Sequence, residues 1–271
     1  MVREAAMAGG NVTAVAACIP KVDHWFDSWT QEALAGALAY LDGVADSRWR
    51  DRLAVAISAA IVRISRQESD TRYAAVGGSK SRAEAATELG RSVVRVCDWL
   101  SENAANLPPT PATVICRDAR DLATLDRNSF AAAVFSPPYP NAYEYWLYHK
   151  YRMYWLGFDP IQVRRDELGA RPHYCKKNGL TASDFRNQMS AVFAGLAHAL
   201  LPGAPIVVVV GDSIIKGRKV DNGKLLAEAA KSTGLELEAS TTRAISGRRS
   251  SFNRAHSRAR KREHVLLFHA P

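Results

Sequence analysis

A proline-rich segment, Phe135-Ser-Pro-Pro-Tyr-Pro-Asn141, carries the residue types in this chain that are best suited to chemistry. It follows the apolar run Ala131–Phe135, which predicts a short buried strand. Successive prolines have no N–H to donate, so they end the strand and leave a rigid loop. This loop presents a hydroxyl, free carbonyl oxygens and an aromatic ring. Because ligands of open α/β sheets bind at the carboxyl ends of strands, it is a candidate site; an ordinary Pro-Pro turn is the alternative.

The four residues Ser136, Pro137, Pro138 and Tyr139 resemble the catalytic motif of the amino-methyltransferases. That resemblance implies methylation, from S-adenosylmethionine, of an exocyclic amine such as cytosine N4 or adenine N6 of DNA. The amine lone pair is delocalised into the base, and acceptors around its N–H groups draw it out of the ring plane. The resemblance gives this part to the Ser136 hydroxyl and the Pro137 carbonyl, and gives Tyr139 the stacking of a base swung out of the duplex. Serine in the first position favours cytosine N4.

A second part of the resemblance lies upstream. The run Thr113–Cys116 predicts a strand, and Asp118 follows it directly. In the resembled family an aspartate just after this strand accepts a hydrogen bond from the adenine amine of the cofactor, and Asp118 matches that place. The alternatives are a loop carboxylate or a cap for the next turn. A strand, this aspartate and a second strand ending in the Ser136 motif are more specific together than either piece alone.

The predicted fold class is α/β, a Rossmann-like S-adenosylmethionine-dependent methyltransferase fold with a helical insertion. We expect a single domain over 1–271, divided into a remnant of the cofactor half (1–21), the helical insertion (22–106) and the catalytic half (107–271). Around the expected ribose-binding acid, Val15–Pro20 holds no carboxylate. On this resemblance we expect the first strand and the Gly-rich cofactor loop to lie outside the chain, with a second polypeptide as one source of that loop.

Periodicity and breaker residues predict the remaining elements. The expected helices are Val2–Ala8, a helix capped by Asp27 or Ser28 that ends at Leu41, a helix capped by Asp46 or Ser47, Ser81–Asn103, a helix capped by Ser183 that ends at Leu201, and Asn222–Thr233. The expected strands are Val12–Val15, Pro205–Val210, Leu235–Thr241 and, antiparallel at the sheet edge, His264–His269. Asp212 would then lie at the same sheet edge as Ser136, either contacting the target base, supporting the loop or only completing a turn. Asp159–Leu180 is predicted to be a polar loop that acts as a lid or contacts DNA.

Basic residues gather near the C-terminus, and the chain has a formal net charge of +9. The predicted phosphate-binding residues are Arg248, Arg249, Arg254, Arg258, Lys261 and Arg262. The alternative is a basic hairpin loop that is only solvated. The segment Arg63–Tyr73 also resembles these bacterial methylases, and its arginines could contact phosphates.

Several function classes are disfavoured by composition. The four cysteines are scattered without a CxxC pair, which argues against a zinc site or a disulfide framework and indicates a reducing, cytoplasmic location. We expect no bound metal. No secretory signal or apolar run long enough to span a bilayer is visible.

The function that we predict is that of a site-specific DNA methyltransferase, of the kind that modifies DNA in restriction-modification systems. Its cofactor would be S-adenosylmethionine and its partner double-stranded DNA. Two alternatives stay open: a non-catalytic DNA-binding remnant or half of a split methylase, and a methyltransferase that acts on RNA or on a protein glutamine.

Overall fold

The computed structural model describes residues 1–12, 16–78, 80–108, 110, 112–140, 143–245 and 261–271. The chain forms two compact units. Unit 1 contains Met1–Thr113 and Trp146–Val163, and unit 2 contains Val114–Tyr145 and Arg164–Pro271. The α/β character of the chain is confirmed, whereas the division of one methyltransferase domain into three segments stays a prediction.

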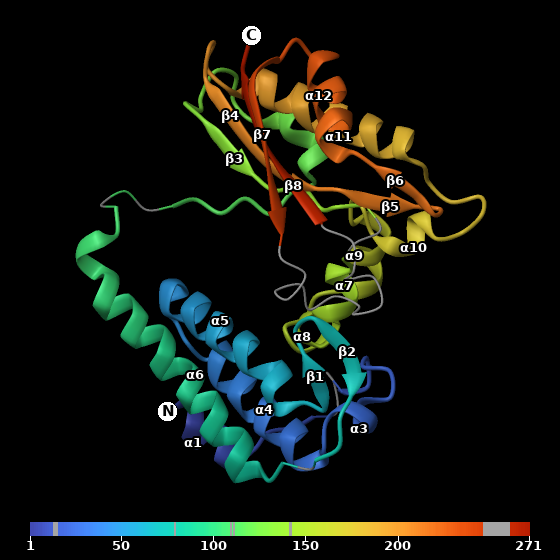
Figure 1. Cartoon of the computed structure of the whole chain (residues 1–271). Coiled ribbons are helices and arrows are strands. Elements are labelled where there is room, and N and C mark those ends of the chain that lie inside the picture. The colour runs from blue at the N-terminus through green and yellow to red at the C-terminus, as the bar shows by residue number, and fades with distance from the viewer. Residues whose placement is uncertain (13–15, 79, 109, 111, 141–142, 246–260) are drawn as a thin grey trace. The chain divides into compact units, whose positions relative to one another are not determined.

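Unit 1 is mainly helical (Figure 1). Its elements are α1 (Val2–Ala8), α3 (Val22–Trp25), α4 (Ser28–Asp42), α5 (Ser47–Ile64), α6 (Arg82–Asn103), η1 (Ala104–Asn106), α8 (Lys150–Trp155) and the short strands β1 (Gln67–Ser69) and β2 (Arg72–Ala75). The predicted helix starts are confirmed. Asp46 accepts a hydrogen bond from the Trp49 N–H at 3.0 Å, and Ser81 forms a capping box with Glu84. These caps satisfy N–H groups that a helix cannot satisfy internally.

The N-terminal segment belongs to this helical unit. A Cβ on Gly36 of α4 would lie 2.3 Å from the Ala5 carbonyl oxygen of α1, so only glycine allows this approach. The strand predicted at Val12–Val15 lies mostly outside the residues that the structure describes.

Three of the aromatic residues that follow the Ser136 motif belong to a hydrophobic core, while Tyr145 is exposed. Trp146, Tyr151 and Trp155 are all buried. Tyr151 stacks on Tyr73 of β2, with ring centroids 6.0 Å apart and hydroxyl oxygens 2.9 Å apart. These residues stabilise unit 1 by packing.

Unit 2 contains a four-stranded sheet in the order β3-β4-β8-β7 (Figure 1). Its elements are η2 (Ala119–Thr124), β3 (Ala133–Phe135), α10 (Arg171–Tyr174), α11 (Ala182–Ala199), β4 (Pro205–Gly211), β5 (Ser213–Ile215), β6 (Arg218–Val220), α12 (Asn222–Lys231), β7 (Glu236–Ile245) and β8 (Lys261–His269). The chain passes between the units within α7 (Tyr145–Tyr148) and α9 (Pro160–Asp166). Strands β3 and β4 are parallel, and β8 is antiparallel to both β4 and β7.

The position predicted for the last strand is wrong. Strand β8 lies between β4 and β7 and not at the edge of the sheet. Its apolar side chains explain this, because Leu266 and Phe268 are buried in the core. A strand whose face is fully covered is stable inside a sheet, where both of its backbone edges find partners.

The strand predicted at Thr113–Cys116 is also absent, and the segment has no regular secondary structure. Val114 is 91% exposed and Ile115 is 53% exposed. A β-branched residue favours a strand only where a neighbouring strand and a covered face are available. None of the described strands pairs with this segment.

Two further predictions need correction. The polar segment Asp159–Leu180 contains the short helices α9 and α10, and Tyr174 within α10 is fully buried. Helix α11 is capped by Thr181, which forms a capping box with Asp184, and not by Ser183.

Among the described residues no helix has both the length and the apolarity needed to cross a lipid bilayer.

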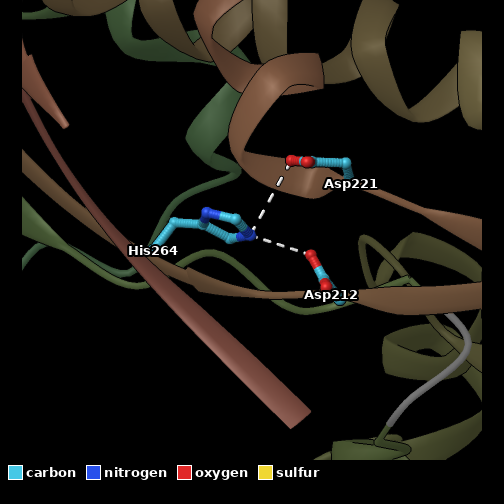
Figure 2. A group of neighbouring side chains, drawn as sticks. All are labelled: Asp212, Asp221 and His264. Atoms are coloured by element: carbon cyan, nitrogen blue, oxygen red, sulfur yellow. Dashed lines mark hydrogen bonds and ion pairs between the residues drawn. The ribbon is translucent and has the colours of Figure 1, made fainter. Parts of the chain in front are cut away.

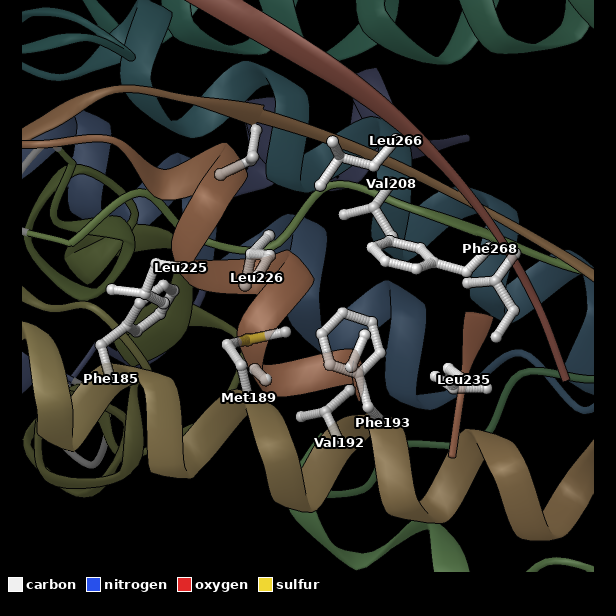
Figure 3. Packing of buried hydrophobic residues seen from close by; sticks show 14 of the residues in the cluster. Phe185, Met189, Val192, Phe193, Val208, Leu225, Leu226, Leu235, Leu266 and Phe268 are labelled. Carbon is white, nitrogen blue, oxygen red and sulfur yellow. The ribbon is translucent and has the colours of Figure 1, made fainter. Parts of the chain in front are cut away.

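The core of unit 2 lies where α11 and α12 pack against the sheet (Figure 3). Phe193 of α11 is at its centre, with its ring centroid 5.6 Å from that of Phe268 in β8. The parallel pair β3–β4 ends next to this core, so the loop after β3 begins from a fixed position.

We therefore predict that Phe193→Ala lowers the free energy of unfolding by about 3–5 kcal/mol, because the cavity in this core cannot close. The matched control is Phe130→Ala in the same unit, where the ring is 43% exposed; its cost should be below about 1 kcal/mol. Denaturant unfolding of both variants measures the difference. Equal costs would contradict the assignment of Phe193 to the core centre.

Candidate functional site

Ser136 is the first residue after β3, and its hydroxyl is tied to the neighbouring strand. Its Oγ donates a hydrogen bond of 2.8 Å to the carbonyl oxygen of Val209 in β4. The side chain is exposed. Because the hydroxyl proton is used in this bond, the oxygen lone pairs remain available to accept hydrogen bonds from a ligand.

The two prolines of the motif are fixed by packing. Pro137 is buried and Pro138 is partly buried. A Cβ on Gly169 would lie 3.2 Å from the Pro138 Cβ and 3.3 Å from the Pro138 carbonyl oxygen. Gly169 also has a φ of +73°, so this position favours glycine for two reasons. The loop is thus held on one side by Gly169 and on the other by β4.

Tyr139 is half-buried, and its hydroxyl donates a hydrogen bond of 3.0 Å to Oε1 of Glu263 in β8. Burial raises the pKa of the Tyr139 hydroxyl; the neighbouring Ser136 hydroxyl lowers it in part, and the Glu263 carboxylate raises it. The ring lies close to Gly211 at the end of β4, where a Cβ would be 2.7 Å from the ring carbon Cε2. Tyr139 therefore has one orientation defined by a hydrogen bond and by a close backbone contact.

Asp118 caps η2 instead of ending a strand. Its Oδ1 accepts hydrogen bonds of 2.9 Å from both the backbone N–H and the Nε of Arg120. The guanidinium also contacts Oδ2, and these bonds lower the pKa of the Asp118 carboxyl. The side chain is 41% exposed. The alternative role as a cap is present in the structure, and the carboxylate is still reachable from solvent.

Asp212 directly follows β4, at the end of the sheet that holds Ser136, as predicted. Figure 2 shows its carboxylate beside His264 of β8 and Asp221, the N-cap of α12. The His264 Nε2 lies 2.8 Å from Asp212 Oδ1 and 3.7 Å from Asp221 Oδ1. Arg262 completes the group, with its Nε 3.1 Å from Asp212 Oδ2.

These side chains form a polar cluster next to the start of β8. The three possible metal-ligand atoms of Asp212, Asp221 and His264 lie within 4.8 Å of one another. The Arg262 guanidinium already supplies positive charge to both carboxylates. The His264 ring Nδ1 lies 3.2 Å from the Thr242 hydroxyl, so both ring nitrogens have partners. Contacts within the cluster satisfy its side chains, and the support of the loop by Asp212 stays a prediction.

Four of the predicted phosphate-binding residues, Arg248, Arg249, Arg254 and Arg258, lie outside the described residues. The backbone of Lys261 begins β8. Arg262 pairs with Asp212, so a phosphate would have to compete with that carboxylate.

The structure brings Ser136, Pro138 and Tyr139 together with residues that the sequence did not single out. The most important of these is Glu263, and Gly211 and Gly169 are the others. One signal was available for Glu263: the polar run Arg262-Glu263-His264 begins an otherwise apolar strand. Charged residues in a strand that is central in its sheet require partners, which the loop and β7 provide.

No protein-family model matches this chain, and no curated protein matches it. Among solved structures, a candidate DNA modification methylase of Thermus thermophilus, in complex with S-adenosyl-L-methionine, is 19% identical with a TM-score of 0.34. The match covers 57% of this chain and 53% of that one, so this chain spans about half of its length. An S-adenosylmethionine-dependent methyltransferase of Methanosarcina mazei is 11% identical with a TM-score of 0.30, over 63% of this chain and 76% of that one.

The Asp118–Arg120 contact gives a pH prediction. Since Arg120 lowers the pKa of the Asp118 carboxyl, the contact contributes its full stability above the ordinary carboxyl pKa and loses it as pH falls through the lowered value. In Arg120→Ala we expect this pKa to rise towards the ordinary value, as measured by a 13C NMR titration of the Asp118 carboxyl. Arg117→Ala removes the same charge nearby and should leave the pKa lowered. An equal rise in both variants would show a general charge effect instead of this contact.

Proposed function

We propose that this chain is an S-adenosylmethionine-dependent amino-methyltransferase that methylates the exocyclic amine of a flipped base in double-stranded DNA, with cytosine N4 favoured. The observation that carries the proposal is the geometry of Ser136. Its hydroxyl gives its proton to the Val209 carbonyl and lies exposed at the carboxyl end of β3. A serine held in this way is a hydrogen-bond acceptor, which is what an amine N–H requires.

The chemistry follows from that acceptor. An N–H of the target amine donates to the Ser136 Oγ, and the other N–H donates to the Pro137 carbonyl. Both bonds draw the nitrogen lone pair out of the base plane and make the nitrogen a better nucleophile. S-adenosylmethionine, when bound, would supply an electrophilic methyl group, and its sulfur would keep the electron pair of the carbon–sulfur bond. The methylated nitrogen then loses one proton to solvent, and fixed positioning supplies much of the acceleration.

The Asp118 carboxylate keeps part of its hydrogen-bonding capacity for the cofactor. A carboxylate has about four acceptor sites, and Arg120 uses several of them without covering the group. An adenine amine can donate to a remaining site, because the side chain is 41% exposed. Asp118 would thus orient the adenine end of the cofactor while Arg120 keeps the carboxyl ionised.

A second polypeptide is one source of the Gly-rich cofactor loop, and it would be needed if the purified chain did not bind the cofactor by itself. Strand β3 is at one end of the sheet order, and Val134 within it is 76% exposed. An edge strand with an exposed β-branched side chain can accept a further strand through its free backbone groups. A strand provided by such a partner would bring its loop beside the Ser136 motif.

The cofactor part can be tested by calorimetric titration of the purified chain with S-adenosylmethionine. We predict saturable binding that Asp118→Ala weakens by about 10-fold, the value of a hydrogen bond of about 1.4 kcal/mol. Asp126→Ala, a change of the same type elsewhere in unit 2, serves as the control and should bind like the wild type. Absence of binding by the wild type would contradict a complete cofactor site in this chain.

The DNA part predicts a strong salt dependence. Changing Arg248, Arg249 and Arg254 together to alanine should lower duplex affinity and reduce the slope of log K against log salt by about 3, one unit per phosphate contact. Arg48, Arg50 and Arg91 of unit 1, changed together, remove the same charge. Fluorescence anisotropy at several salt concentrations measures both slopes. If the two triple variants have the same slope, the C-terminal arginines are not a specific phosphate site.

A further inference from the structure

Tyr139 is the part of the motif whose orientation depends on other elements. Its hydroxyl donates a hydrogen bond to Glu263 and also interacts with the Ser136 hydroxyl, and its ring lies close to the backbone at Gly211. These two residues are directly opposite each other in the antiparallel pairing of β4 with β8. The hydroxyl end and the edge of the ring therefore both contact a single cross-strand pair.

Glu263 is itself held in place. The residue is 9% exposed, which is unusual for a carboxylate, and each of its oxygens has a separate partner. Oε1 accepts from Tyr139, and Oε2 accepts from the Nε of Arg243 at 2.6 Å. Arg243 is the residue opposite Glu263 in β7, and its terminal nitrogen contacts the same Oε2. Because the arginine fixes one oxygen, the other oxygen points to a defined place.

Gly211 allows the ring to approach. It is not among the glycines of the described chain that have a positive φ, so its role is space and not backbone conformation. A methyl group there would be 2.7 Å from one ring carbon and 3.0 Å from the next, both on the same edge of Tyr139. Real Cβ atoms do not approach so closely, so any larger residue must displace the ring.

We propose that Glu263 is a positioning residue for the reaction, which acts through the Tyr139 hydroxyl and is held by Arg243. This role rests on the proposed function, because Glu263 fixes the orientation of the Tyr139 ring, and that ring is assigned to stack on the flipped base. A ring with one orientation loses no rotational freedom when a base stacks on it, which is the benefit of preorganisation. Glu263 contacts neither the base nor the cofactor in this scheme.

The test is a double-mutant cycle with Glu263→Ala, Tyr139→Phe and the combination, measured as single-turnover methyl transfer to duplex DNA. We expect Glu263→Ala to slow transfer by about 10²-fold, the scale of a small misplacement, with S-adenosylmethionine affinity unchanged. In the Tyr139→Phe background the hydroxyl is gone, so Glu263→Ala should have no further effect. Glu263→Gln keeps an acceptor oxygen and should recover most of the rate.

Glu238→Ala is the matched control, because Glu238 is on the neighbouring strand β7 and contacts the exposed His269 instead of the motif. It should transfer methyl groups at the wild-type rate. Multiplicative effects of Glu263→Ala and Tyr139→Phe would overturn the proposal, because they would show that Glu263 acts on the rate without Tyr139. A wild-type rate in Glu263→Ala would overturn it as well.

A second readout does not depend on catalysis. With 13C-labelled tyrosine, the Tyr139 resonance is identified by its loss in Tyr139→Phe. The carboxylate of Glu263 contributes to the raised pKa of the Tyr139 hydroxyl, so this pKa should fall in Glu263→Gln and stay raised in Glu238→Ala. An unchanged titration in Glu263→Gln would refute the contact. If the wild type transfers no methyl group, the proposed function fails, whereas this titration still decides whether Glu263 positions Tyr139.

Discussion

The antiparallel run of β8 between β4 and β7 is the constraint on which the site depends. Parallel strands alone would place only the ends of β3 and β4 at this edge of the sheet. By entering from the opposite direction, β8 brings Glu263 and His264, near its start, to the place where β4 ends. The polar start of one strand thus supports the loop that follows another, and its apolar remainder fills the core.

Two kinds of support result from this arrangement. The Glu263 carboxylate holds the loop directly through Tyr139, with Arg243 behind it. The adjacent His264 holds Asp212, which fixes the chain as it leaves β4. Both carboxylates are largely buried, and a buried carboxylate is retained only where cations or donors surround it. The contacts with Arg243, Arg262 and His264 offset the free-energy cost of burying these two carboxylates. The result is a loop with one defined conformation, which a positioning site requires.

Local signals in the sequence were sufficient for the long helices and for the position of the motif, but not for the short helices α9 and α10. Capping residues such as Asp46 and Ser81 act within one turn, so their effect is visible without tertiary structure. The order of the strands was not visible, because pairing depends on partners far away in the chain. For the same reason Val114 and Ile115 predicted a strand that the described sheet does not contain. Glu263 and Gly211 were missed because their roles arise only from the register between β4 and β8.

The most direct measurement is the identification of the methylated product. Duplex DNA is incubated with the chain and S-adenosylmethionine, digested to nucleosides and analysed by mass spectrometry, with Ser136→Ala in parallel. We predict N4-methylcytosine as the product; N6-methyladenine would keep the amino-methyltransferase proposal and refute the preference for cytosine. Ser136→Ala should lower the yield by about 10²-fold, as for removal of one transition-state hydrogen bond. A chain that binds both cofactor and duplex yet leaves every exocyclic amine unmodified would contradict it.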